Sequence, residues 1–166
     1  WRDYFGPKAR LYGVDIWPGC AQFEEENTKI FIGDQEDRQF LKALTESIPK
    51  IDILIDDGGH YPQQQINTFE VLFPLISDDG VYLIEDLHTS YWKDYGGGYK
   101  QGGTFIEYSK DFIDHINAWY SEDLINSDFT RTVSSLHYYD SVLVIEKRKA
   151  QSEKPTYAET GNKTLE

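Results

Sequence analysis

The chain has 166 residues, no methionine and a single cysteine, Cys20. One cysteine excludes an intramolecular disulfide and fits a reducing compartment, so we expect a cytoplasmic protein. No apolar run reaches the length of a membrane-spanning helix, which argues against an integral membrane protein. No basic and apolar leader with a small-residue cleavage site opens the chain, so nothing in it indicates secretion.

Basic residues are also scarce. Sixteen Lys and Arg stand against 29 Asp and Glu, which gives a formal net charge of −13. No cluster of basic side chains offers a patch for a phosphate backbone, so the charge balance argues against a nucleic-acid partner. Hydrophobic residues make up 39% of the sequence, enough for one domain with its own core. We expect this domain to span residues 1–149, followed by a polar tail at residues 150–166.

Strand-like and helix-like segments alternate along the domain. Short β-branched or apolar runs predict strands at residues 10–16, 29–34, 51–57 and 81–86. Helical spacing of apolar residues predicts helices at 37–48, 62–76 and 104–125, with a turn at Asp79–Gly80. Two closing strands, at 131–139 and 141–147, are joined by a tight turn that favours antiparallel pairing. The order predicts an α/β fold of the Rossmann-like, doubly wound type, with a mostly parallel sheet and an antiparallel last strand.

Every predicted parallel strand ends in acidic side chains. These are Asp15, Asp34, the pair Asp56–Asp57 and the pair Glu85–Asp86. Ligands of open parallel sheets bind beyond the carboxyl ends of the strands, so these acids are candidates for a binding site. Capping of the following helix is the alternative for any single acid, because Asp accepts hydrogen bonds from free N–H groups there. Four such strand ends together favour a binding site.

The first two acids indicate an adenosine-containing cofactor. A carboxylate at the position of Asp15 is suited to accept hydrogen bonds from both hydroxyls of a ribose. Asp34 follows one strand later, where the adenine of the same cofactor is expected. NAD and S-adenosylmethionine both use this geometry, so the residues alone leave the choice between them open.

The remaining acids predict a metal site. Neighbouring strands place Asp57 beside Glu85 and Asp86, and three converging carboxylates suit Mg²⁺ or another hard divalent ion. Without a cation, the three charges would repel and raise one another's pKa. His60 follows Asp57 by three residues, across a glycine-opened turn, and an imidazole there can take a proton from a hydroxyl. The alternative for His60 is a turn histidine bonded to the backbone.

Two further segments each allow two interpretations. His88, Tyr91 and Trp92 follow the last acidic pair and either line a substrate pocket or pack as ordinary aromatic side chains. The loop at residues 94–103 contains five glycines and is either a lid over the pocket or a flexible connection. It lacks the Gly-Lys-Ser/Thr of a phosphate-binding loop.

The order of these motifs resembles a known family. Gly-Val-Asp at 13–15, Gly-Asp-Gln at 33–35, Ile-Asp-Asp-Gly-Gly-His at 55–60 and Leu-Ile-Glu-Asp-Leu-His-Thr-Ser-Tyr-Trp at 83–92 resemble class I S-adenosylmethionine-dependent methyltransferases. More narrowly, they are similar to the metal-dependent sugar O-methyltransferases of macrolide biosynthesis. The resemblance covers residues 1–92 well and the rest in general shape. It implies Mg²⁺-assisted methyl transfer from S-adenosylmethionine to a hydroxyl of a sugar or glycosylated small molecule.

The resemblance also implies a role for each matching residue. It assigns Asp57, Glu85 and Asp86 to Mg²⁺, His60 to proton abstraction, and Asp15, Asp34, Gln35 and Asp56 to the cofactor. It further implies a small-molecule glycoside as acceptor, a place in natural-product biosynthesis and an oligomeric enzyme.

One departure from the family concerns the start of the fold. The family begins with a strand and a glycine-rich loop, and nothing of that kind precedes Arg10. We therefore expect the first strand–helix unit to be absent and the chain to be a fragment of a longer enzyme. Two other functions stay open. A nicotinamide-dependent oxidoreductase of similar fold leaves the metal-type acids unexplained, and a non-catalytic binding module fits a lost cofactor loop.

Overall fold

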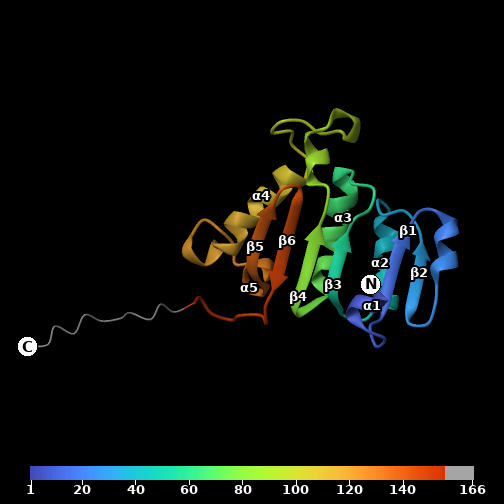
Figure 1. Cartoon of the computed structure of the whole chain (residues 1–166). Helices are drawn as coiled ribbons and strands as arrows, with labels where there is room; N and C mark the ends of the chain where they lie inside the picture. The colour runs from blue at the N-terminus through green and yellow to red at the C-terminus, as the bar shows by residue number, and fades with distance from the viewer. Residues whose placement is uncertain (156–166) are drawn as a thin grey trace, which may run out of the picture.

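The computed structural model describes residues 1–155, and its elements follow the predicted alternation (Figure 1). The strands are β1 (Leu11–Asp15), β2 (Thr28–Ile32), β3 (Ile51–Asp56), β4 (Ile76–Ile84), β5 (Val133–Tyr139) and β6 (Val142–Lys147). The α-helices are α1 (Arg2–Phe5), α2 (Arg38–Ser47), α3 (Pro62–Leu72), α4 (Phe105–Ile116) and α5 (Asp128–Thr132). Short 3₁₀ helices are η1 (Pro18–Phe23), η2 (Phe73–Leu75), η3 (Leu87–Tyr91), η4 (Lys93–Tyr95) and η5 (Ala118–Tyr120). Most of the expected tail at 150–166 lies outside the described residues.

The strands form two parallel pairs and an antiparallel extension. β1 pairs with β2 and β3 pairs with β4, both in parallel. β6 lies between β4 and β5 and runs antiparallel to both, so the four-stranded sheet has the order β3-β4-β6-β5. The predicted α/β fold with an antiparallel last strand is therefore confirmed. Within residues 1–155, β1 and β2 form a separate two-stranded sheet, and no helix has the length and apolarity needed to cross a membrane.

Two predicted helices end earlier than their apolar spacing indicates. α3 ends at Leu72 rather than at residue 76, because Pro74 has no N–H with which to continue the helical hydrogen bonds. α4 ends at Ile116 rather than at residue 125. There the side chain of Asn117 donates to the carbonyl of Ile113, and only the short η5 follows.

The strand predicted at 81–86 begins earlier and ends earlier. β4 runs from Ile76 to Ile84, and the expected turn at Asp79–Gly80 is an irregularity inside it. The register jumps there from the pair Ile51–Ile76 to the pair Ile53–Val81, and Asp79 has a positive φ of 66°. Since the strand ends at Ile84, Glu85 and Asp86 lie beyond the carboxyl end of the strand, where a ligand can reach them.

The main core lies between the mixed sheet and the helices α3, α4 and α5, which stand behind it in Figure 1. Its most buried members include Tyr82, Ile84, Phe105, Val133, Leu143 and Ile145, all without exposed surface. A second cluster of Leu41, Leu44, Ile48 and Leu72 holds α2 against α3. Burial of these side chains fixes β3 and β4 side by side, and with them the loops that follow each strand.

Tyr108 of α4 makes the stability of the fold depend on pH. Its hydroxyl donates to Glu70 of α3, and burial, with the negative charge of Glu70, raises the pKa of Tyr108 to about 12. In the unfolded chain a tyrosine titrates near its ordinary pKa of about 10. Between these two values the unfolded state binds fewer protons, so the free energy of unfolding falls as the pH rises.

We expect Tyr108→Phe to make this fall shallower by about 1 kcal/mol, a value discounted because the side chain is only partly buried. Urea unfolding at pH 9 and pH 12 measures it. Tyr4→Phe is the matched control, because Tyr4 is 81% exposed. Equal slopes in wild type and Tyr108→Phe would contradict the assignment.

Candidate active site

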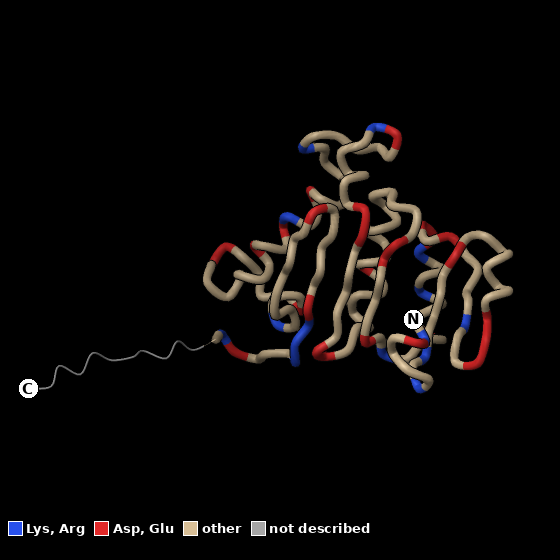
Figure 2. The backbone as a smooth tube through the Cα atoms, viewed as in Figure 1, with Lys and Arg blue, Asp and Glu red and all other residues tan. Residues whose placement is uncertain are grey.

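Acidic residues gather where the parallel strands β1, β3 and β4 end (Figure 2). β3 ends at Asp56, and residues 57–61 then lead into α3. β4 ends at Ile84, and residues 85–86 lead into η3. Asp56 and Ile84 are partners in the β3–β4 register, and the N–H of Glu85 donates to the carbonyl of Asp56 at 3.0 Å. The two loops therefore begin at the same point of the sheet edge.

These loops bring His60, Asp57 and Asp86 together. Nε2 of His60 lies 3.4 Å from Oδ2 of Asp86 and 3.8 Å from Oδ1 of Asp57. One potential ligand atom from each of the three lies within 4.8 Å of the other two. The imidazole is 16% exposed, while the carboxylates of Asp57 and Asp86 are 61% and 47% exposed. The group therefore opens to solvent through its carboxylates, above a mostly buried imidazole.

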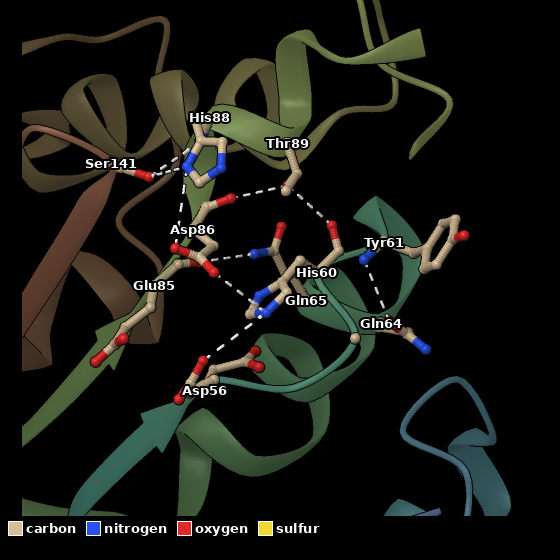
Figure 3. Close-up of polar contacts among 12 residues, drawn as sticks. Asp56, His60, Tyr61, Gln64, Gln65, Glu85, Asp86, His88, Thr89 and Ser141 are labelled. Atoms are coloured by element: carbon tan, nitrogen blue, oxygen red, sulfur yellow. Dashed lines mark hydrogen bonds and ion pairs between the residues drawn. The ribbon is translucent and has the colours of Figure 1, made fainter. Parts of the chain in front are cut away.

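Glu85 is placed differently from its neighbour. Its side chain is directed away from His60 in Figure 3, and it is not a member of the three-residue group. Its backbone carbonyl accepts a hydrogen bond from Gln65 of α3 at 3.2 Å. The predicted role of Glu85 as a metal ligand therefore requires its side chain to turn, and it stays a prediction.

In each of the two loops that follow β3 and β4, one member of the three-residue group has a left-handed backbone conformation. His60 has φ 59° and Asp86 has φ 53°, values that non-glycine residues rarely adopt outside constrained sites. The buried hydroxyl of Thr89 is 3.0 Å from the carbonyl of His60 and 2.8 Å from that of Asp86. One side chain thus ties together the two strained residues that carry the group (Figure 3).

Asp56 and Gln35, both predicted to contact the cofactor, use their side chains inside the protein. Nε2 of Gln35 donates to Oδ1 of Asp56 at 2.7 Å, and the hydroxyl of Tyr82 donates to Oδ2 at 3.0 Å. Burial raises the pKa of the Asp56 carboxyl, and these two hydrogen bonds oppose that rise. Oε1 of Gln35 accepts from the N–H of Gly59, and a Cβ on Gly58 would lie 2.1 Å from the same oxygen. The pair therefore supports the loop that presents His60, and its contact with a cofactor stays a prediction.

Asp15, the last residue of β1, and Asp34, on the loop after β2, lie apart from this group. Oδ1 of Asp15 accepts the N–H of Trp17 at 2.7 Å, and Oδ1 of Asp34 accepts the N–H of Glu36 at 2.8 Å. Both bonds span two residues, as in the local turns that Asp often forms. Both residues are exposed, so neither carboxylate is buried in the protein interior. Their predicted contact with a cofactor stays a prediction.

Asp86 also faces a second histidine. Its Oδ1 is 3.9 Å from Nδ1 of His88, whose ring packs edge-on against Trp92 at 4.5 Å between centroids. The same Nδ1 is 2.6 Å from the hydroxyl of Ser141, which comes from the β5–β6 turn. Asp86 therefore directs one carboxylate oxygen toward each histidine.

Thr89 and Ser141 are site residues that the motif reasoning missed. Thr89 lies inside the quoted motif, but Ser141 is distant in sequence and had no local signal.

The donor set fits a hard divalent cation. Carboxylate oxygens are the ligands that Mg²⁺ prefers, and two of them converge here with an imidazole at hand. Nδ1 of His60 and Oε1 of Gln65 are buried without a hydrogen-bond partner in the described residues. Buried polar atoms are normally satisfied, so unpaired ones beside a carboxylate group indicate a place for water or a ligand.

Comparison with known proteins places this geometry in context. No family model matches the chain. It is 34% identical over 165 residues to the 8-demethyl-8-(2-methoxy-alpha-L-rhamnosyl)-tetracenomycin-C 3'-O-methyltransferase of Streptomyces olivaceus, covering 95% of the chain and 42% of the relative. It is 32% identical over 153 residues to the mycinamicin VI 2''-O-methyltransferase of Micromonospora griseorubida, covering 89% of the chain and 38% of the relative. The chain thus spans about two fifths of the length of these relatives.

A solved structure agrees with the sequence relatives. The methyltransferase MycE of the mycinamycin pathway, in complex with Mg, SAH and mycinamycin VI, superposes with a TM-score of 0.84 at 31% identity. The match covers 95% of this chain and 41% of that one. The fold is therefore that of the class I methyltransferases. Within that class, the chain is a homologue of the sugar O-methyltransferases that act in macrolide and tetracenomycin pathways.

Proposed function

We propose that this chain carries the catalytic residues of an S-adenosylmethionine-dependent, Mg²⁺-assisted O-methyltransferase that acts on a hydroxyl of a sugar or glycosylated small molecule. The observation that carries the proposal is the convergence of Asp57, His60 and Asp86 at the carboxyl ends of β3 and β4. The homologues named above support it, since both are named as O-methyltransferases and one of them as acting on a rhamnosyl-tetracenomycin. In the same proposal, the acceptor is a small glycoside and the enzyme acts in natural-product biosynthesis. The proposal also includes a cytoplasmic location and an oligomeric state.

In this proposal Asp57, Glu85 and Asp86 hold Mg²⁺. Mg²⁺ held there would polarise the acceptor hydroxyl, and S-adenosylmethionine would supply the methyl group from its sulfonium. Asp15 binds the cofactor ribose, and Asp34, Gln35 and Asp56 shape the adenine side. Asp56 and Gln35 do so through the loop that they support, since their polar atoms bond to one another.

His60 takes the proton from the acceptor hydroxyl. Its Nε2 faces the two carboxylates of the group, whereas Nδ1 is buried. Nε2 is therefore the atom that a bound hydroxyl can reach. Asp86, 3.4 Å from Nε2, stabilises the positive charge that the imidazole gains when it takes the proton. Correct placement of hydroxyl and methyl group supplies much of the rate.

The direct test is transfer of a radiolabelled methyl group from S-adenosylmethionine to α-L-rhamnosides, with Mg²⁺ and with EDTA. The protein assayed carries this chain together with any sequence that adjoins it in its natural protein. We expect label in the glycoside only when Mg²⁺ is present. Absence of transfer to every glycoside, together with absence of S-adenosylhomocysteine binding by calorimetry, would favour the non-catalytic alternative.

Thr89 is expected to position the group rather than to react. Replacing it with valine removes the hydroxyl that bonds both left-handed residues while keeping the side-chain volume. Loss of a group that orients metal ligands typically lowers metal affinity about 10–100-fold, so we expect a Mn²⁺ affinity in that range below wild type. Electron paramagnetic resonance of Mn²⁺ measures it. Thr89→Ser should restore the affinity, and a Thr89→Val protein with wild-type affinity would rule out this role.

A further inference from the structure

A cavity of about 490 Å³ lies on the helical side of the mixed sheet. Its wall comes from the end of α3, from η2, α4 and α5, and from Lys147, the last residue of β6. The three α-helices are the ones that stand behind the sheet in Figure 1. The candidate active site lies at the other end of α3, because Pro62 begins that helix two residues after His60. The cavity is therefore separate from the site proposed for methyl transfer.

Aromatic rings from three helices form one continuous surface in this cavity. Between ring centroids, Phe69 lies 4.6 Å from Phe112, which lies 4.9 Å from Phe129. Phe129 in turn lies 5.7 Å from Phe73, and Tyr108 adds a fifth ring to the wall. Phe69, Tyr108 and Phe129 are only partly buried, so a ligand can reach them. The face of an aromatic ring carries partial negative charge, so a surface of this kind attracts cations.

One cation of the chain already lies against this surface. Nζ of Lys147 is 5.0 Å from the centroid of the Phe73 ring and donates to the carbonyl of Ile76 at 2.8 Å. Burial lowers the pKa of Lys147, and the ring and the carbonyl are the contacts that favour its charged form. A ring of this cluster is thus placed to face a positive charge.

The charged side chains of the wall are mainly acidic. Glu70, Asp111 and Asp128 line the cavity, and Lys147 is its one lysine or arginine. Glu70 and Asp128 each pair with an arginine from outside the wall. The carboxylate of Asp111 has no hydrogen bond or ion pair with any of residues 1–155. The cavity therefore keeps one unpaired negative charge beside its aromatic surface, and a phosphate or carboxylate ligand would meet repulsion there.

We propose that this cavity binds an organic cation, a protonated or quaternary amine with an apolar body of one or two rings. The ammonium group lies over the rings of Phe69 and Phe129, with Asp111 as its counter-ion. The apolar body fills the space that remains along the aromatic surface. The volume lies within the range of small-molecule pockets, roughly 300–1,000 Å³, and so has room for a molecule of this size.

Saturation-transfer-difference NMR with benzyltrimethylammonium tests the site, on the same protein as the methyl-transfer assay. Benzyl alcohol and benzenesulfonate, which carry the same ring without charge and with a negative charge, are the comparison ligands. We expect the cation to bind more tightly than the alcohol, and the sulfonate not to bind. Phe129→Leu keeps an apolar side chain but removes a ring face, and should weaken binding of the cation about 2–10-fold. Asp111→Asn should weaken it about 2–5-fold, because water partly screens the exposed carboxylate.

Two control variants locate the bound cation. Asp114→Asn makes the same change at an exposed position of α4 outside the wall, and should bind as wild type. Asp86→Asn should also bind as wild type, because its carboxylate belongs to the separate group at the strand ends. Equal binding of the three ligands, or equal losses in Asp111→Asn and Asp114→Asn, would overturn the proposal. A loss in Asp86→Asn alone would place the cation at the strand ends and overturn it as well. Circular dichroism shows that each variant is folded.

Discussion

His60→Ala is expected to lower the rate of methyl transfer about 10²–10⁴-fold, the usual contribution of a positioned general base. The affinity for Mn²⁺ should stay within a few-fold of wild type, because the carboxylates of Asp57 and Asp86 remain. The expectation follows from the position of Nε2, which faces both carboxylates from a side chain that is only 16% exposed. A base in this position is shielded from bulk water but open to a hydroxyl held between the carboxylates.

Controls for this variant separate loss of the base from loss of the fold. His115→Ala removes an exposed histidine of α4 that lies outside the candidate site and should retain wild-type turnover. His60→Gln keeps a polar side chain of similar reach but no base, and should be as inactive as His60→Ala. Wild-type turnover in both His60 variants would contradict the assignment of His60 as the base. Lost turnover with lost Mn²⁺ binding would instead make His60 part of the metal site.

Much of the fold could be predicted because its signals are local. Continuous apolar runs bounded by glycine or acid marked β1 to β4, and the short connection between residues 139 and 142 required an antiparallel hairpin. The errors arose where apolar spacing continued past the end of a helix. Beyond Leu72 and Ile116, a proline and a capping side chain end the helix although hydrophobic residues follow. Spacing reports which residues are buried, not whether the backbone hydrogen bonds continue.

The candidate site could be predicted in part, because strand ends are visible in the sequence but side-chain directions are not. Asp56 and Asp57 are adjacent, and successive residues of a strand point to opposite faces. Asp56 therefore points into the protein toward Tyr82, while Asp57 reaches the group with His60. Glu85 and Asp86 both lie beyond the end of β4, and there the left-handed backbone of Asp86, whose carbonyl accepts from Thr89, has no signal in the sequence. Only the three-dimensional structure shows such contacts.

The largest loss of metal affinity is expected from Asp86→Asn and Asp57→Asn. Each variant removes one negative charge and one ligand oxygen from the group while keeping the side-chain shape. Since loss of a group that only orients a ligand costs about 10–100-fold, loss of the ligand itself should cost about 100-fold or more. Calorimetric titration of Mn²⁺ measures the affinity. Asp140→Asn, outside the group, is the control with the same chemical change.

Glu85→Gln distinguishes a preorganised ligand from one that must move. The resemblance to the family assigns Glu85 to the ion, but its side chain is directed away from His60 (Figure 3). Turning that side chain consumes part of the free energy that its carboxylate gains at the ion, so its loss should cost less, about 10-fold. The expected order of affinity loss is therefore Asp86→Asn and Asp57→Asn above Glu85→Gln. A Glu85→Gln loss as large as that of Asp86→Asn would mean that the ion sits closer to Glu85 than to His60. Unchanged affinity in Asp57→Asn and Asp86→Asn would remove the group formed with His60 as the metal site.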